Sequence, residues 1–138
     1  MIDSNIRKLV KKYNTNCPFV LAEKLNIMVE YRTLPPSCRG YYLYVRKRRF
    51  IAINKALPYI MQRFVCAHEL GHDRLHKGFG HYFIEQNTLF NPGKFERQAN
   101  TFAVRLLTYD RHFEEDESVE SFCRRNDIPL EMVEYIVN

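Results

Sequence analysis

The chain is organised around residues 64–72, which read Phe64-Val65-Cys66-Ala67-His68-Glu69-Leu70-Gly71-His72. In an α-helix, residues four apart lie on the same face, so His68 and His72 can both direct an imidazole nitrogen at one metal ion. Glu69 lies about 100° around the helix from His68, beside such an ion rather than on it. The neighbouring residues are apolar or small, which favours a buried helix over two surface histidines on an ordinary one.

The spacing of His68, Glu69 and His72 is typical of a hydrolytic metal site. A zinc ion open to water lowers the pKa of its bound water toward ~7, and a nearby carboxylate can accept the proton as the water attacks a carbonyl. We therefore predict that His68 and His72 bind Zn²⁺ and that Glu69 is the general base. Sites of this type also accept Mn²⁺, Co²⁺ or Fe²⁺, so another divalent ion is the alternative.

A catalytic zinc ion takes a third protein ligand, and the candidates in the sequence are His76, His81, Glu85 and Glu96. His76 is about 12 Å along the helix axis from His68, which is too far. We expect His76 to face the helix C-terminal dipole, with a substrate contact as the alternative. Glu96 has Asn100 one turn on, where an amide could orient a ligating imidazole. We predict Glu96 as the ligand and Asn100 behind it, with Glu85 as the alternative.

Two other kinds of zinc site do not fit this sequence. The extended metzincin motif requires Gly at position 75 and His at position 78, where the chain has Leu75 and Gly78. A closed structural site usually adds a Cys ligand. Cys66 is about 200° around the helix from His68 and therefore points away. The four cysteines are far apart in sequence and are expected to be reduced, structural thiols.

Local patterns predict one α+β domain over residues 1–138. Its expected parts are a helical N-terminus (3–26), a three-stranded sheet (27–54), a long helix (58–77), a loop (78–92), a second helix (94–107) and two C-terminal helices (118–137). The basic run Arg46-Lys47-Arg48-Arg49 is expected at the solvated tip of a hairpin between two of the strands.

Charge is distributed unevenly along the chain. Residues 1–63 carry 13 Lys/Arg and 3 Asp/Glu, whereas residues 64–138 carry 8 and 13. A basic half can mark contact with nucleic acid or with an acidic protein. No apolar stretch approaches the ~20 residues of a membrane span, and the N-terminus lacks a secretory signal. We expect a cytoplasmic monomer with no membrane contact.

Several segments resemble the ImmA/IrrE family of metallopeptidases. They are the run 64–72 with Leu75 and His76 after it, the run Glu96-Arg97-Gln98-Ala99-Asn100-Thr101-Phe102-Ala103, and the strand segments 40–42 and 51–54. The resemblance implies a minimal thermolysin-like zincin domain with His68, His72 and Glu96 as zinc ligands and Glu69 as base. It also implies a bacterial, phage or mobile-element protease whose substrate is a helix-turn-helix repressor.

A regulator that holds zinc and binds a repressor or DNA without cleavage is the main alternative. Residues 119–133 loosely resemble a helix-turn-helix, but Glu131 and Glu134 in its second helix disfavour a phosphate-rich groove. For a protease, we expect the substrate to lie extended along a sheet edge. The candidates for contact with the substrate or the transition state are Tyr41, Tyr42, His76 and His81.

Overall fold

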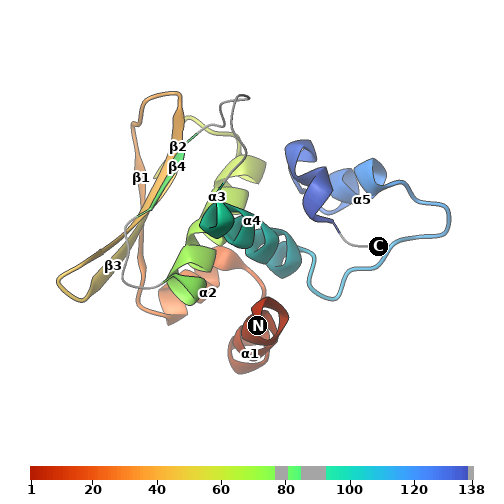
Figure 1. Cartoon of the computed structure of the whole chain (residues 1–138), viewed down its shortest axis with the longest axis horizontal. Coiled ribbons are helices and arrows are strands. Elements are labelled where there is room, and N and C mark those ends of the chain that lie inside the picture. The colour runs from red at the N-terminus through yellow and green to blue at the C-terminus, as the bar shows by residue number, and fades with distance from the viewer. Residues whose placement is uncertain (77–80, 85–92, 137–138) are drawn as a thin grey trace.

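A mixed β-sheet forms one side of the molecule, and helices pack against a single face of it (Figure 1). The structure is a computed structural model that describes residues 1–76, 81–84 and 93–136. The elements are, in chain order, α1 (Ile2–Tyr13), α2 (Pro18–Lys24), β1 (Met28–Arg32), β2 (Cys38–Val45), β3 (Arg48–Asn54), α3 (Tyr59–Leu75), β4 (His81–Ile84), α4 (Lys94–Leu107), α5 (Val119–Arg125) and the 3₁₀ helix η1 (Leu130–Tyr135).

The strands lie in the order β1-β3-β2-β4. β1 pairs with β3 in parallel, whereas β2 pairs antiparallel with both β3 and β4. Arg46 and Lys47 join β2 to β3 with φ values of 51° and 64°, the left-handed backbone that a two-residue hairpin turn requires. The basic run therefore does form a hairpin tip, although Arg49 turns back toward the protein and contacts Asp73.

The predicted α+β class and its three predicted strands are confirmed, and the sheet has one strand more than expected. β4 adds a fourth strand in the segment expected to be a loop, because its backbone pairs with β2 from Cys38 to Tyr42. The second C-terminal helix is also shorter and tighter than expected, since residues 130–135 form a 3₁₀ helix. Cys17, Cys38, Cys66 and Cys123 are all free, and the last three are buried.

Helix α3 lies between the sheet and α4 (Figure 1). Its central residues, Phe64–Asp73, are all buried, as expected for a helix that is covered on every side. On the sheet, Tyr42, Ile51 and Ile53 are fully buried and form part of the same core. The histidines and the glutamate of the motif therefore lie in the interior of the protein.

Two glycines allow these layers to approach closely. A Cβ atom at Gly40 would lie 2.5 Å from the carbonyl oxygen of Ala52 and 2.7 Å from Cγ1 of Val65. A Cβ atom at Gly71 would lie 3.1 Å from Cβ of Phe102. Gly40 therefore sets the distance between β2 and α3, and Gly71 that between α3 and α4.

Replacing Gly40 by Ala is expected to lower the free energy of unfolding by about 1–3 kcal/mol, because a methyl group overpacks the contact between β2 and α3. Chemical denaturation measures this loss. Gly93→Ala is the matched control, since a Cβ atom there has no neighbour within 4 Å, and its effect should stay within about 0.5 kcal/mol. Equal stabilities of the two variants would contradict the packing argument.

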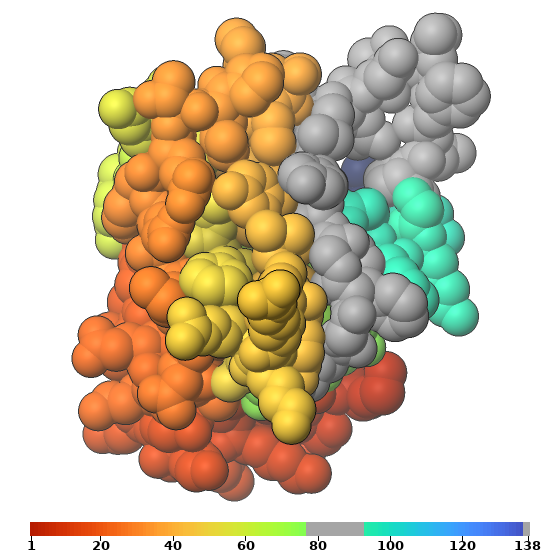
Figure 2. All heavy atoms as spheres, turned by 90° about the vertical axis from the view of Figure 1, so that its left-hand side faces the viewer, coloured from red at the N-terminus to blue at the C-terminus, as the bar shows by residue number. Residues whose placement is uncertain are grey.

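None of the described helices covers the second face of the sheet, so residues of β1, β2 and β3 form much of the surface in Figure 2. Tyr41 lies on this outer face because side chains alternate along β2 and Tyr42 points toward α3. Among the described helices, none is both long enough and apolar enough to cross a bilayer.

Candidate metal centre

The two histidines of α3 meet a carboxylate from α4. Nε2 of His68 lies 3.1 Å from Oε2 of Glu96, and Nε2 of His72 lies 2.8 Å from Oε1 of the same side chain. Both histidines are fully buried, whereas Glu96 is 30% exposed. Two imidazoles from one helix and a carboxylate from another thus meet at one point.

Asn100 holds the other side of the His68 ring. Its Oδ1 atom lies 2.8 Å from Nδ1 of His68, and an amide oxygen can only accept a hydrogen bond. Nδ1 of His68 therefore donates, which leaves the lone pair of the neutral ring on Nε2, facing Glu96. The amide of Asn100 donates in turn to the hydroxyl of Tyr135 at 3.2 Å, so η1 also supports the site.

Glu69 is the buried acid of the centre. It is fully buried, and no group in the described part of the chain donates a hydrogen bond to either carboxylate oxygen. Burial, reinforced by the negative charge of Glu96, raises its pKa well above the ordinary value. One ligand atom from each of His68, Glu69 and His72 lies within 4.8 Å of the others. A buried carboxylate beside two imidazoles fits a bound cation, because a charge there needs a partner.

The pKa of Glu96 shifts in the opposite direction to that of Glu69. Burial alone would raise it, but in the metal-free site hydrogen bonds and positive charge from protonated His68 and His72 outweigh that effect and lower it. Two carboxyl groups in one site therefore prefer different protonation states. Such divergence is typical of acid–base sites, in which one group is a fixed charge and the other exchanges a proton.

The raised pKa of Glu69 predicts a pH-dependent stability for the protein freed of metal by a chelator. The ordinary pKa of a glutamate side chain is 4.5. Above this pH, Glu69 is ionised in the unfolded chain but still protonated in the folded protein, so the free energy of unfolding falls as pH rises. Metal-free Glu69→Gln is therefore expected to be more stable than the metal-free parent at neutral pH, with the difference vanishing in acid. Denaturation of both at several pH values tests this, and a pH-independent difference would contradict it.

The structure brings together His68, Glu69, His72, Glu96 and Asn100, whereas Tyr41 and Tyr42 lie away from that point. Tyr42 is fully buried and its hydroxyl donates to Asp73, so the expected substrate contact by Tyr42 is wrong. Tyr41 lies on the outer face of the sheet. Glu85 and the side chain of His81 are outside the described residues. His76 lies at the end of α3 and contacts His72.

Sequence reasoning missed a buried polar cluster behind the motif. Asp73 is fully buried and accepts hydrogen bonds from the Tyr42 hydroxyl at 2.6 Å, from Arg49 at 3.1 Å and from Arg74 at 2.7 Å. Arg49 also donates to the carbonyl of Leu25. The cluster joins β2, β3 and α2 to the C-terminal half of α3. Burial and the bond to Asp73 raise the pKa of Tyr42, which keeps its hydroxyl a donor.

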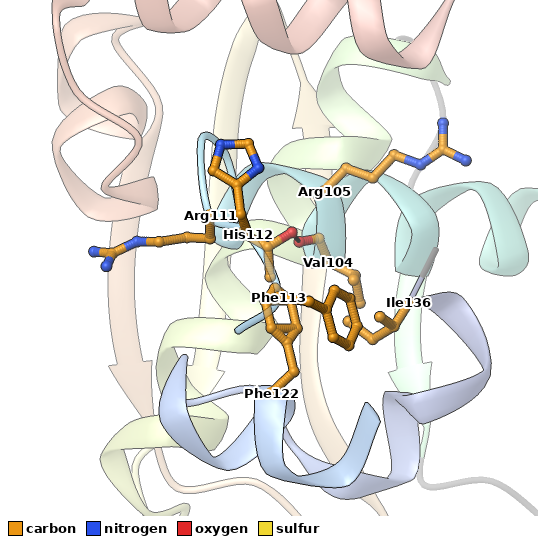
Figure 3. Close-up of a pocket in the computed structure, with 8 residues that line it drawn as sticks. Val104, Arg105, Arg111, His112, Phe113, Phe122 and Ile136 are labelled. Atoms are coloured by element: carbon orange, nitrogen blue, oxygen red, sulfur yellow. Dashed lines mark hydrogen bonds between the residues drawn. The ribbon is translucent and has the colours of Figure 1, made fainter. Parts of the chain in front are cut away.

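A separate cavity of about 330 Å³ lies between α4, α5 and the segment that joins them. In Figure 3, Phe113 and Phe122 are lining residues near the middle of the view, whereas Arg105 and Arg111 point outward. The two phenyl rings are stacked with centroids 4.2 Å apart, and none of the residues that line the cavity belongs to the metal centre.

Comparison with known proteins identifies the family of the chain. Residues 22–121 match the IrrE N-terminal-like domain of peptidase family M78. The chain therefore belongs to the ImmA/IrrE family of metallopeptidases, a family that acts on proteins through a bound metal.

Two relatives come from Bacillus and one of its phages. The chain is 35% identical to the uncharacterized immunity region protein 2 of Bacillus phage phi105, over 136 residues that cover 96% of this chain and 86% of that protein. It is 28% identical to metallopeptidase ImmA of Bacillus subtilis (strain 168), over 116 residues that cover 83% of this chain and 67% of that protein. No solved structure matches the chain significantly.

Proposed function

We propose that residues 1–138 form one zinc-dependent endopeptidase domain, in which His68, His72 and Glu96 bind Zn²⁺ and Glu69 is the general base. The observation that carries this proposal is the meeting of two imidazole Nε2 atoms with one carboxylate, beside a buried carboxylate that has no donor in the described chain. Two histidines and one acid are a ligand set of catalytic zinc, which leaves a position for water and substrate.

Each residue of the proposed site has a different role in peptide hydrolysis. When bound by His68, His72 and Glu96, zinc would supply Lewis acidity toward the scissile carbonyl and the attacking water. Glu69 takes the proton from the attacking water and passes it to the leaving amine. Glu96 would bind as a carboxylate and offset part of the charge of the ion. Asn100 keeps the His68 ring in the tautomer that offers Nε2.

The substrate we propose is a helix-turn-helix repressor of a phage or integrative element in the bacterial cytoplasm. Family resemblance supports this choice, and so does the relative from a phage immunity region. We further propose that the cleaved segment binds in extended form along β4, which ends the sheet beside β2 and contacts α3. An added strand there would take its main-chain hydrogen bonds from the sheet edge.

The test is cleavage of the repressor encoded beside the gene for this chain. The purified protein is stripped with a chelator, reloaded with Zn²⁺ and incubated with that repressor. We expect one cleavage, seen by mass spectrometry, only in the reloaded sample. An intact repressor that nevertheless forms a complex with the loaded protein would contradict proteolysis and support a binding regulator, which the exposed Arg46 and Lys47 at the hairpin tip favour.

A further inference from the structure

His72 has its own support on the side away from Glu96. Nδ1 of His72 lies 3.0 Å from Nδ1 of His76, and Nε2 of His76 lies 2.7 Å from Oε1 of Gln98. These contacts form a series of hydrogen bonds that runs from His72 on α3 to Gln98 on α4, two positions after Glu96. The support of His68 by Asn100 thus has a counterpart at His72.

Gln98, at the end of this hydrogen-bond series, determines which ring nitrogen of each histidine carries a proton. The oxygen of Gln98 can only accept, so Nε2 of His76 donates to it. A neutral imidazole with its proton on Nε2 has its lone pair on Nδ1. Nδ1 of His76 therefore accepts, and Nδ1 of His72 donates to it. In the neutral, metal-binding form of His72 the lone pair is then on Nε2, the nitrogen that lies 2.8 Å from Glu96.

His76 is held in place for this contact. It is the C-cap of α3, with φ of −130°, and its amide donates to the carbonyl of His72 at 2.7 Å. Leaving the helix at this residue lets the ring turn back toward His72. The ring is 5% exposed and is stacked on Phe95 of α4, with centroids 4.0 Å apart and planes 20° apart. Ring position and proton position are therefore both constrained.

We propose that His76 is a positioning residue that holds His72 in its metal-binding tautomer and orientation, and that Gln98 sets the proton position of His76. The inference rests on the proposed zinc site and adds a role for two residues outside its ligand set. His76 does not bind the ion, because its Nδ1 atom faces His72 and its Nε2 atom faces Gln98.

Zinc affinity of a matched pair of His76 variants tests the proposal. His76→Phe keeps an aromatic ring against Phe95 but removes the acceptor for His72. His76→Asn loses the ring but keeps an oxygen where Nδ1 was. We expect His76→Phe to weaken zinc binding about 10–100-fold, measured by competition with a chromogenic chelator, and His76→Asn to restore most of it. Undiminished affinity in folded His76→Phe would overturn the proposal, as would equal losses in the two variants.

A pair of Gln98 variants tests the same proposal if the His76→Phe protein does not fold. Gln98→Leu removes the acceptor for Nε2 of His76, whereas Gln98→Glu keeps one. We expect weaker zinc binding in the first and near-parental binding in the second, although their metal-free stabilities are similar. Unchanged zinc affinity in folded Gln98→Leu would overturn the proposal.

Zinc binding by the parent protein distinguishes failure of this inference from failure of the proposed function. If the parent binds no zinc, the proposed site itself is wrong. If the parent binds one ion and the His76 and Gln98 variants bind it equally well, the zinc site stands and only the positioning role fails.

Discussion

Replacing Glu69 by Gln is expected to slow repressor cleavage by about 10²–10⁴-fold, the usual contribution of a general base, while zinc binding is retained. Gln has nearly the volume of Glu and fits the same fully buried position, but it cannot take a proton from water. Cleavage is followed by electrophoresis with the zinc-loaded protein, and the metal content is measured on the same sample.

The matched control for this experiment is Glu120→Gln, which removes an exposed carboxylate on α5. It should cleave at the parental rate. Full activity in Glu69→Gln would contradict the assignment of the base. Loss of zinc from Glu69→Gln would instead indicate that Glu69 contributes to metal binding.

Replacing Asp73 by Ala is expected to lower the free energy of unfolding by about 3–5 kcal/mol, because it leaves buried partners without their acceptor. Arg49 is only 17% exposed, and the Tyr42 hydroxyl is buried with it. Urea denaturation of metal-free protein measures the loss without a contribution from zinc. Tyr42→Phe removes a single hydrogen bond and should cost about 1 kcal/mol.

Asp3→Ala is the surface control for Asp73→Ala. Asp3 pairs with Arg105 at 3.0 Å, but the two side chains are 67% and 37% exposed. An exposed pair of this kind contributes about 0–1 kcal/mol. Similar losses in the two variants would mean that the Asp73 cluster contributes no more than a surface ion pair.

The two central helices could be placed from local sequence signals. The predicted helix 58–77 is observed as Tyr59–Leu75 with Pro58 as its N-cap, and the predicted helix 94–107 is observed as Lys94–Leu107. Helical spacing also indicated that Glu96 and Asn100 share a face, so the convergence of these side chains on His68 could be expected.

The sheet was harder to predict because its pairing is long-range. β4 has four residues, and only its register with β2 makes it a strand. The placement of β3 between β1 and β2 likewise leaves no local signal. Tyr41 and Tyr42 are chemically alike, so alternation alone could not decide which of them faces α3. The role of His76 depends on how α3 packs on α4, which no spacing within α3 reveals.

The absent side chain at Gly71 has a consequence beyond packing. Gly71 precedes His72, and its contact with Phe102 sets the spacing of the helices that carry the ligands. A methyl group at position 71 would push the helices apart by a few tenths of an ångström, comparable to the ~0.5 Å tolerance of a preorganised site. The span between the two imidazoles and Glu96 is therefore determined by a residue that has no functional group at all.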